Sequence, residues 1–157
     1  GEIGIADSGG TYAILRTSWV VSAHGANFIK TMLRLSETHH TLNIVGDQIG
    51  GPTPARDIAV ACLQIAEQLV QEPSKSGIYH FSGTPDVSWA DFAREIFEQA
   101  GKSVTVTPIP TTDYPTPAQR PLNSRMDCTA TKRVFGIERP DWITGLKTIL
   151  NDLEART

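Results

Sequence analysis

The segment that decides the fold is YAILRTSWVV, residues 12–21 of a 157-residue chain. It is rich in aliphatic, β-branched and aromatic side chains and follows glycines, which predicts a mostly buried strand ending near Ser18 or Trp19. Residues 77–83 (GIYHFSG) predict a second buried strand closed by a turn. Strands that alternate with helical patterns indicate a largely parallel α/β sheet, because parallel neighbours need helical crossovers.

Five helices are predicted between and after these strands. Asn27 can cap the first, and the second runs from Pro54 to about Val70. Ser88 and Asp91 form a capping-box variant before the third, a short helix covers residues 129–135, and a tail helix follows. The faces expected to be buried are Phe28, Met32 and Leu35 in the first helix, Ile58, Cys62, Ile65 and Leu69 in the second, and Ile143, Leu146, Ile149, Leu150 and Leu153 in the last.

The rest of the chain carries weaker sequence signals for strands and loops. Residues 42–45 and 104–106 predict short strands, and residues 108–121, with five prolines, predict an ordered loop or a linker. We see no internal repeat and no domain boundary. Two parallel strands are too few to stand alone, and the chain begins with Gly1 rather than Met, so we expect the rest of the sheet to lie upstream.

Charge and composition limit the classes of binding partner that the chain is expected to have. Lys and Arg number 14 against 17 Asp and Glu, a net charge of −3, and no basic cluster exceeds Lys132-Arg133, so nucleic acid and an anionic membrane surface are not expected as partners. The longest apolar run, residues 58–63, is far too short to cross a bilayer. With only two distant cysteines and no leader pattern, a cytoplasmic protein is expected. The four histidines lack zinc-site spacing, so no metal is predicted.

The usual motifs of a complete enzyme are missing: we find no Gly-rich dinucleotide loop, no Walker lysine loop and no Gly-x-Ser-x-Gly nucleophile. Three polar clusters remain, namely Trp19 with Asn27, Asp47-Gln48 beside Thr53, and Arg120 with Asn123 and Arg125. The first lies past a strand end, where α/β sheets bind ligands, the second suits sugar hydroxyls, and the third can clamp a diphosphate. Each also has a plain structural interpretation: a helix cap and a packed ring, a simple turn, and surface arginines in solvent.

Taken in order, several segments carry a family resemblance: residues 15–20 (LRTSWV), 27–28 with 31–35, Asp47-Gln48 with Gly50, Pro52 and Thr53, residues 77–83, Ser88-Trp89 with 92–93 and 96–97, Arg120-Pro121 with Asn123-Ser124, and Pro140 with Trp142, Gly145 and Leu146. They resemble the dTDP-4-dehydrorhamnose reductase family of the extended short-chain dehydrogenase/reductase superfamily. The resemblance spans about residues 12–150 and places the chain in the C-terminal half of the family's layout.

The resemblance implies a fold and a division of labour. Residues 1–157 would form the end of a Rossmann-type parallel sheet plus the small mixed α/β substrate-binding domain, while the N-terminal dinucleotide-binding portion is absent from this chain. The family reduces dTDP-4-dehydro-L-rhamnose to dTDP-L-rhamnose with NADPH or NADH, supplying rhamnose for cell-envelope polysaccharides. Its catalytic Tyr-x-x-x-Lys would precede Gly1, because none of Tyr12, Tyr79 and Tyr114 has a lysine four residues later. No catalytic residue is therefore assigned here, and the chain alone is expected to be inactive.

The resemblance also places residues around the sugar nucleotide: Trp19, Asn27, Gln48, Thr53, Arg120 and Asn123. Two positions depart from the family pattern. Val21 stands where many relatives have tyrosine, and Arg56 stands where some relatives carry an acidic residue that helps to hold a metal at a dimer interface. For this chain we predict no metal.

Two other functions stay open at this point. One is a non-catalytic sugar-nucleotide-binding or regulatory module of the same fold, and the other is reduction of a different nucleotide sugar. Without the strands beside residues 12–18, the chain would expose unpaired backbone groups and apolar side chains. We therefore expect it to self-associate, and a homodimer is considered for the parent protein.

Overall fold

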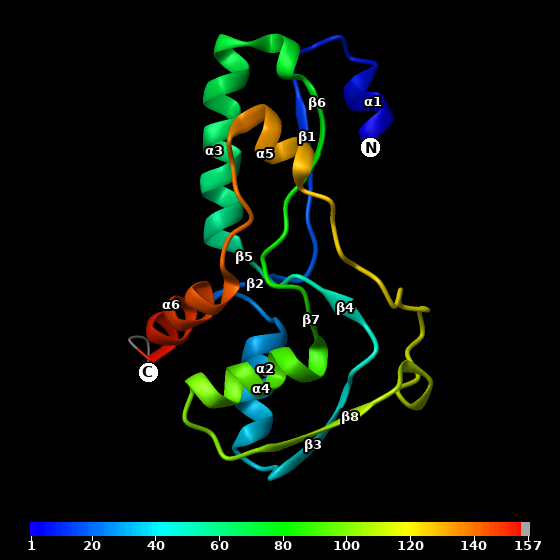
Figure 1. Ribbon diagram of the computed structural model, residues 1–157, viewed down its shortest axis with the longest axis vertical. Coiled ribbons are helices and arrows are strands. Elements are labelled where there is room, and N and C mark those ends of the chain that lie inside the picture. The colour runs from blue at the N-terminus through cyan, green and yellow to red at the C-terminus, as the bar shows by residue number, and fades with distance from the viewer. Residues whose placement is uncertain (155–157) are drawn as a thin grey trace.

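The computed structural model describes residues 1–154, arranged as two lobes one above the other (Figure 1). The sheet lobe holds α1 (Glu2–Ala6), β1 (Ala13–Arg16), α3 (Ala55–Gln71), β6 (Gly77–His80) and α5 (Thr129–Phe135). The cleft lobe holds α2 (Phe28–Ser36), β3 (Thr41–Val45), α4 (Trp89–Gln99), β8 (Thr105–Ile109) and α6 (Trp142–Glu154). Shorter elements complete the chain: β2 (Val20–Val21), β4 (Ile49–Gly50), β5 (Thr53–Pro54), β7 (Val87–Ser88) and the 3₁₀ turns η1 (Pro73–Lys75) and η2 (Thr111–Asp113).

The strands form pairs, most of them parallel. β1 pairs with β6, β2 with β5 and β3 with β8, all in parallel, whereas β4 and β7 are antiparallel. In the first pair Leu15 lies opposite Tyr79, so the two long strands expected from the sequence are parallel neighbours. The predicted mixed α/β class with parallel strands is confirmed.

Each lobe has its own hydrophobic cluster. In the cleft lobe Phe92 and Ile96 of α4 are completely buried, together with Ile29 of α2 and side chains from α6. In the sheet lobe a smaller cluster joins α3 and α5 to the strands through Ile65, Leu69, Tyr79 and Phe135. The cleft lobe is therefore the better packed of the two.

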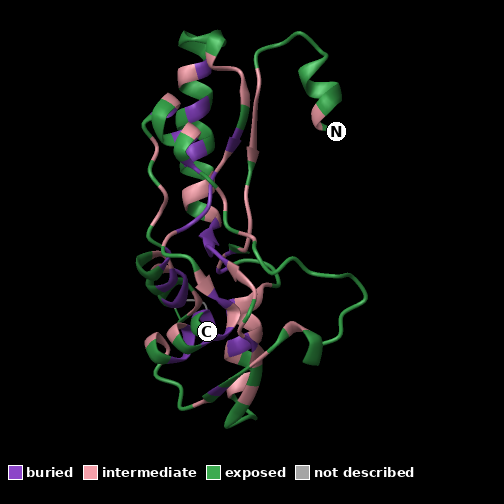
Figure 2. Cartoon of the chain, turned by 45° about the vertical axis from the view of Figure 1, so that its right-hand side comes forward, coloured by how far each residue is buried: buried purple, intermediate pink, exposed green. Residues whose placement is uncertain are grey.

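The sheet lobe leaves apolar surface uncovered. β1 is only half-buried and has β6 as its one partner strand within residues 1–154, so its other edge is open (Figure 2). Leu63 and Val70 on α3 are 67% and 79% exposed, and Ile78 on β6 is 46% exposed. Large apolar side chains on an element's outer face are typical of a surface that packs against further structure.

The decisive segment 12–21 is not one strand. It divides into β1 and β2, because Trp19 adopts φ 49° and turns the chain between them. β6 is also shorter than the predicted 77–83, since Phe81 to Gly83 pass into the junction between the lobes. The strand was predicted to end near Ser18 or Trp19 and ends slightly earlier, at Arg16; the second strand β2 was not predicted.

The helix predictions hold in outline. Asn27 caps α2 by accepting a hydrogen bond from the Lys30 amide, and Ser88 caps α4 by accepting one from the Asp91 amide. The buried seam of α3 was predicted wrongly at Cys62, which is exposed, because Ala61 takes the inner position.

Two further expectations needed correction. Ile143 of α6 is 38% exposed, and its neighbour Trp142 is buried in its place. The predicted 104–106 strand is β8, which runs on through Pro108; proline is tolerated there because β8 is an edge strand that pairs with β3 alone. Of the helices within residues 1–154, none has the length and apolar character required to cross a membrane.

Thr53 joins the two lobes. This completely buried side chain donates to the Ser18 carbonyl (2.8 Å) and to the Gly51 carbonyl (3.0 Å), and accepts from the Gly83 amide (3.1 Å). Its own amide donates to the Trp19 carbonyl (3.0 Å). One residue of β5 thus holds the chain just after β1 and just after β6, where both strands leave the sheet lobe.

Replacing this hydroxyl should be costly. Thr53→Val keeps the shape but leaves buried backbone groups without partners, so we expect the free energy of unfolding to fall by about 2 kcal/mol. Thr53→Ser keeps the hydroxyl and serves as the matched control, with a smaller loss from the missing methyl group. Urea unfolding of the three proteins measures the difference; equal stability of the Val variant and wild type would contradict this account.

Candidate functional site

A cleft of about 830 Å³ opens between β1, α2, β3 and the proline-rich loop. Its apolar wall comes from both strands and helices of the cleft lobe, and its polar groups come mostly from loops. The lining residues are Trp19, Phe28, Thr31, Met32, Leu35, Leu42, Asn43, Ile44, Val45, Gln48, Trp89, Tyr114, Thr116, Arg120, Pro121 and Ser124. An apolar, aromatic hollow with a few convergent polar groups is the usual form of a small-molecule site.

Three of the six predicted site residues, Trp19, Gln48 and Arg120, line this cleft. They come from segments far apart in the sequence: the end of β1, the turn before β4, and the proline-rich loop. The fold therefore brings one member of each predicted polar cluster to the same cavity.

Gln48 and its neighbour Asp47 tie the proline-rich loop to the cleft. The Asp47 carboxylate accepts from the Thr111 amide (3.0 Å to each oxygen) and from the Thr111 hydroxyl (2.6 Å). Gln48 Nε2 donates to the same hydroxyl (3.2 Å). Because Thr111 donates to the charged carboxylate, the pKa of Asp47 lies below its ordinary value. At its far end the loop is joined to β4, since the Ile49 amide donates to the Leu122 carbonyl and the Ser124 amide to the Ile49 carbonyl.

Arg120 is the cation of the cleft. It lies on the exposed stretch of this loop, and its guanidinium has no hydrogen-bond or ion-pair partner within residues 1–154. Its neighbour Arg125, in contrast, is bound to Asn123, whose Oδ1 accepts from the Arg125 amide and Nε. An uncommitted guanidinium beside an apolar hollow can bind a phosphate or carboxylate in bidentate fashion.

The other three predicted residues do not line the cleft. Asn27 caps α2, and its Nδ2 donates to the Ser22 carbonyl (2.7 Å). Thr53 is buried in the junction described above, and Asn123 forms a bridge to Ile49 in addition to holding Arg125. Each fixes a segment that borders the cleft. For Asn27 this is the helix cap left open above, whereas the junction bonds of Thr53 and the bond of Asn123 to Arg125 were not among the structural interpretations considered.

Sequence reasoning missed Trp89 and Tyr114 as candidate site residues. Trp89 is the first residue of α4, and its ring stacks on Trp19 with centroids 3.5 Å apart and 13° between the planes. The signal available was a tryptophan directly after the Ser88 cap, and Trp89 is partly buried in the structure. Tyr114 follows η2 and is 56% exposed, so only the fold of the loop reveals its place.

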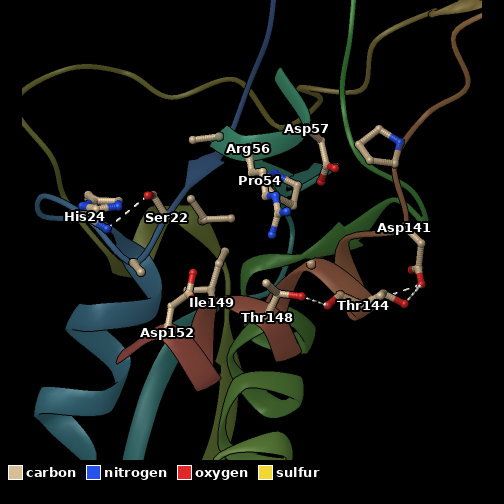
Figure 3. A pocket seen from close by; sticks show the side chains of 15 residues that line it. Ser22, His24, Pro54, Arg56, Asp57, Asp141, Thr144, Thr148, Ile149 and Asp152 are labelled. Carbon is tan, nitrogen blue, oxygen red and sulfur yellow. Dashed lines mark hydrogen bonds between the residues drawn. The ribbon is translucent and has the colours of Figure 1, made fainter. Parts of the chain in front are cut away.

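A second hollow of about 700 Å³ lies on another side, between the start of α3 and α6 (Figure 3). None of the six predicted residues lines it. Its charged groups are mixed, with Arg56 beside Asp57 at the start of α3, and Asp141 committed to capping α6 through Thr144. Partial burial raises the pKa of Asp57. Within residues 1–154 no three His, Cys, Asp or Glu side chains gather as they would around a metal ion.

The family of the chain follows from its match to a family model. Residues 1–155 match the model described as the RmlD substrate binding domain. The chain belongs to this family. The cleft, with its apolar wall and its free guanidinium, is thus a feature of an RmlD substrate-binding domain.

Relatives of this RmlD substrate-binding domain include several dTDP-4-dehydrorhamnose reductases. The chain is 46% identical over 148 residues to the dTDP-4-dehydrorhamnose reductase of Sinorhizobium fredii, covering 90% of this chain and 50% of the relative. It is 50% identical over 143 residues to that of Aggregatibacter actinomycetemcomitans, covering 87% and 49%. The structure of the Bacillus anthracis dTDP-4-dehydrorhamnose reductase in complex with NADP is similar with a TM-score of 0.82 at 34% identity, covering 96% of this chain and 51% of that one. The chain spans about half the length of the relatives that it matches.

The attachment of the proline-rich loop should respond to acid. The pKa of Asp47 is lower in the folded chain than the value of about 3.9 in an unfolded one, so the stability it contributes is complete above that value and is lost as the pH falls through the lower, folded pKa. We expect the NMR resonance of the Thr111 amide proton to move across this acidic range. Asp47→Asn should abolish the transition, whereas Asp113→Asn, a matched change in η2, should keep it. A transition that persists in Asp47→Asn would assign it to another group.

Proposed function

We propose that this chain is the substrate-binding half of a cytoplasmic dTDP-4-dehydrorhamnose reductase, which reduces dTDP-4-dehydro-L-rhamnose to dTDP-L-rhamnose at the expense of NADPH or NADH and so supplies polysaccharide biosynthesis. The observation that carries this proposal is the cleft, where a free guanidinium borders an apolar, aromatic wall in a chain of the RmlD substrate-binding family. The relatives that share this half are named for that activity.

The cleft offers a place for each part of a sugar nucleotide. Arg120 is suited to the diphosphate, because a planar guanidinium binds phosphate oxygens in pairs. The apolar wall, with Met32 and Leu42 among its members, suits the thymine ring and its methyl group. Trp19 and Gln48, which follow the carboxyl ends of β1 and β3, are then left for the sugar, since ligands of α/β sheets bind beyond the carboxyl ends of the strands.

The nicotinamide cofactor does not fit the residues of this chain. A dinucleotide is usually held by a glycine-rich turn between a strand and a helix. The corresponding junction here, from β5 to α3, passes through buried Pro54, which has no N–H to donate, and Thr53, whose amide already donates to Trp19. We therefore assign the cofactor and the hydride transfer to the portion upstream of Gly1, and to this chain only the binding and orientation of the substrate.

The other three predicted site residues act indirectly, through the segments that border the cleft. We assign Asn27, Thr53 and Asn123 to holding the cleft's borders, because the hydrogen bonds of their side chains go to the protein itself. Loss of any of them would alter the cleft through the position of α2, of the junction or of the proline-rich loop.

The role of Arg120 can be tested by comparing two ligands. Arg120→Ala should weaken binding of dTDP about tenfold while leaving thymidine unaffected, because only dTDP carries the diphosphate that the guanidinium holds. Arg133→Ala removes an equally exposed arginine from α5 in the sheet lobe and is the matched control. Isothermal titration of both ligands measures the affinities. Equal losses for dTDP in the two variants, or an equal loss for thymidine in Arg120→Ala, would place the diphosphate elsewhere.

A second prediction follows from assigning substrate binding to this chain and hydride transfer to the upstream portion. The 157-residue chain alone should show no NADPH-dependent reduction and should self-associate in sedimentation, because the β1 edge and the apolar residues of α3 are uncovered. Joined to the sequence encoded upstream, it should gain activity and lose the association that the exposed surface causes.

The upstream sequence itself separates the competing functions. A glycine-rich phosphate loop and a Tyr-x-x-x-Lys ending shortly before Gly1 are expected for the reductase. An upstream half that restores folding but lacks the Tyr-x-x-x-Lys, and shows no turnover, would instead identify a non-catalytic module that binds nucleotide sugars. A panel of nucleotide sugars tested on the active, joined protein would reveal a relative that reduces a different substrate.

A further inference from the structure

The backbone of Trp19 is held in a conformation that side chains rarely adopt. Its φ of 49° is in the left-handed region, and within residues 1–154 it is the one residue other than glycine with a positive φ. Such a conformation is unfavourable for a bulky residue and persists where the surroundings enforce it. Here Thr53 enforces it, since its amide donates to the Trp19 carbonyl and its hydroxyl to the carbonyl of Ser18.

The Trp19 ring is held as firmly as its backbone. On one side it lies against Gly50, where an added Cβ would come within 2.7 Å of the indole Cε2 atom, so glycine is the residue that leaves room for the ring. Against it lies Trp89, stacked nearly parallel at 3.5 Å. Both rings line the cleft.

The position of Trp89 is itself fixed by a helix cap and by a neighbouring ring. It begins α4 directly after the Ser88 cap, where the Ser88 hydroxyl accepts from the Asp91 amide (3.0 Å) and donates to the Asp91 carboxylate (2.6 Å). Its ring also packs on Phe28 of α2, with centroids 4.6 Å apart. Trp89 therefore links the packed helices α2 and α4 to Trp19, which lies just beyond β1.

We propose that Trp89 is a positioning residue that fixes the Trp19 indole as a preformed wall of the nucleotide-sugar site. This inference rests on the proposed function for the identity of the ligand, and deepens it. A ring that is already immobilised loses no freedom when the ligand binds, so affinity depends on Trp89 through Trp19. A flat aromatic ring at position 89 is required, and apolar bulk is not enough.

The position of Trp19 is tested first without any ligand. All variants carry Trp142→Phe, which removes the third tryptophan, a buried side chain of α6 that does not line the cleft. In Trp89→Phe and Trp89→Leu, Trp19 is then the sole tryptophan, and its emission is excited selectively over that of the tyrosines. The Phe variant should keep Trp19 shielded, whereas the Leu variant should shift its emission to the red and make it more accessible to acrylamide. Equal shielding in the two variants overturns the proposal. Trp89→Met provides a second non-aromatic side chain if the Leu variant does not fold.

The link to binding is tested by a double-mutant cycle with dTDP as the ligand. Trp89→Leu should weaken dTDP binding on the order of tenfold when Trp19 is present, and should have no further effect in the Trp19→Ala background, because its influence passes through the ring at position 19. Trp89→Phe should retain most of the affinity. A loss of the same size in both backgrounds would mean that Trp89 acts on the ligand directly or through general stability, and would overturn the proposal.

The fluorescence test and the dTDP-binding cycle can fail independently of each other. If the chain with an intact Trp19–Trp89 stack does not bind dTDP, the proposed function fails, while the fluorescence of Trp19 still decides whether Trp89 positions it. If dTDP binds but the cycle shows no coupling, the substrate site stands and the positioning role is wrong.

Discussion

The structure depends on the hydrogen bonds of one buried hydroxyl. Thr53 ties the chain leaving β1 and the chain leaving β6 to the segment that starts α3, and it does so where the polypeptide passes from one lobe into the other. Buried backbone groups need partners, and the irregular segments here cannot supply them to one another through a sheet. Gly51 and Gly83 fit because an added Cβ on either would collide with a neighbouring carbonyl oxygen, that of Gly83 or of Pro52. The same residue holds Trp19 in its unusual conformation, so the junction and the cleft share one constraint.

From this junction the cleft is built by packing. The completely buried Phe92 and Ile29 fix α4 against α2, and the aromatic chain from Phe92 through Phe28 and Trp89 reaches Trp19 in successive contacts of 5.5, 4.6 and 3.5 Å between centroids. Aromatic pairs in such series add to stability beyond the area they bury. The polar side of the cleft is built differently, because it lies on a proline-rich loop. Asp47 and Thr111 attach one end of this loop, and backbone hydrogen bonds to β4 attach the other. The packed apolar wall thus faces a loop that is held at one end by hydrogen bonds to a charged carboxylate.

The elements that sequence predicted well are those with a local cause. The caps Asn27 and Ser88 and the helices after them follow from side chains within a few residues, and the parallel pairing of β1 with β6 follows from two apolar runs with helical segments between them. Cys62 was predicted wrongly because Ala61 and Cys62 are both small and apolar, so periodicity alone could not fix the rotation of α3. The end of the strand near Trp19 was predicted from the local pattern, but the left-handed conformation of Trp19 depends on Thr53 and Gly50, over thirty positions away. Residue chemistry selected six candidate site residues, but only the fold shows that Trp19, Gln48 and Arg120 line the cleft while the side chains of Asn27, Thr53 and Asn123 bond to the protein itself.

The two lobes contribute unequally to the cleft. The cleft lobe, with its own buried cluster, carries most of the apolar wall. The sheet lobe has the smaller cluster, an open strand edge and exposed apolar residues on α3, and it contributes Trp19 to the cleft from just beyond the end of β1. Because Thr53 and Trp89 contact Trp19 from the junction and from the cleft lobe, the chain just beyond β1 is fixed by contacts on both sides.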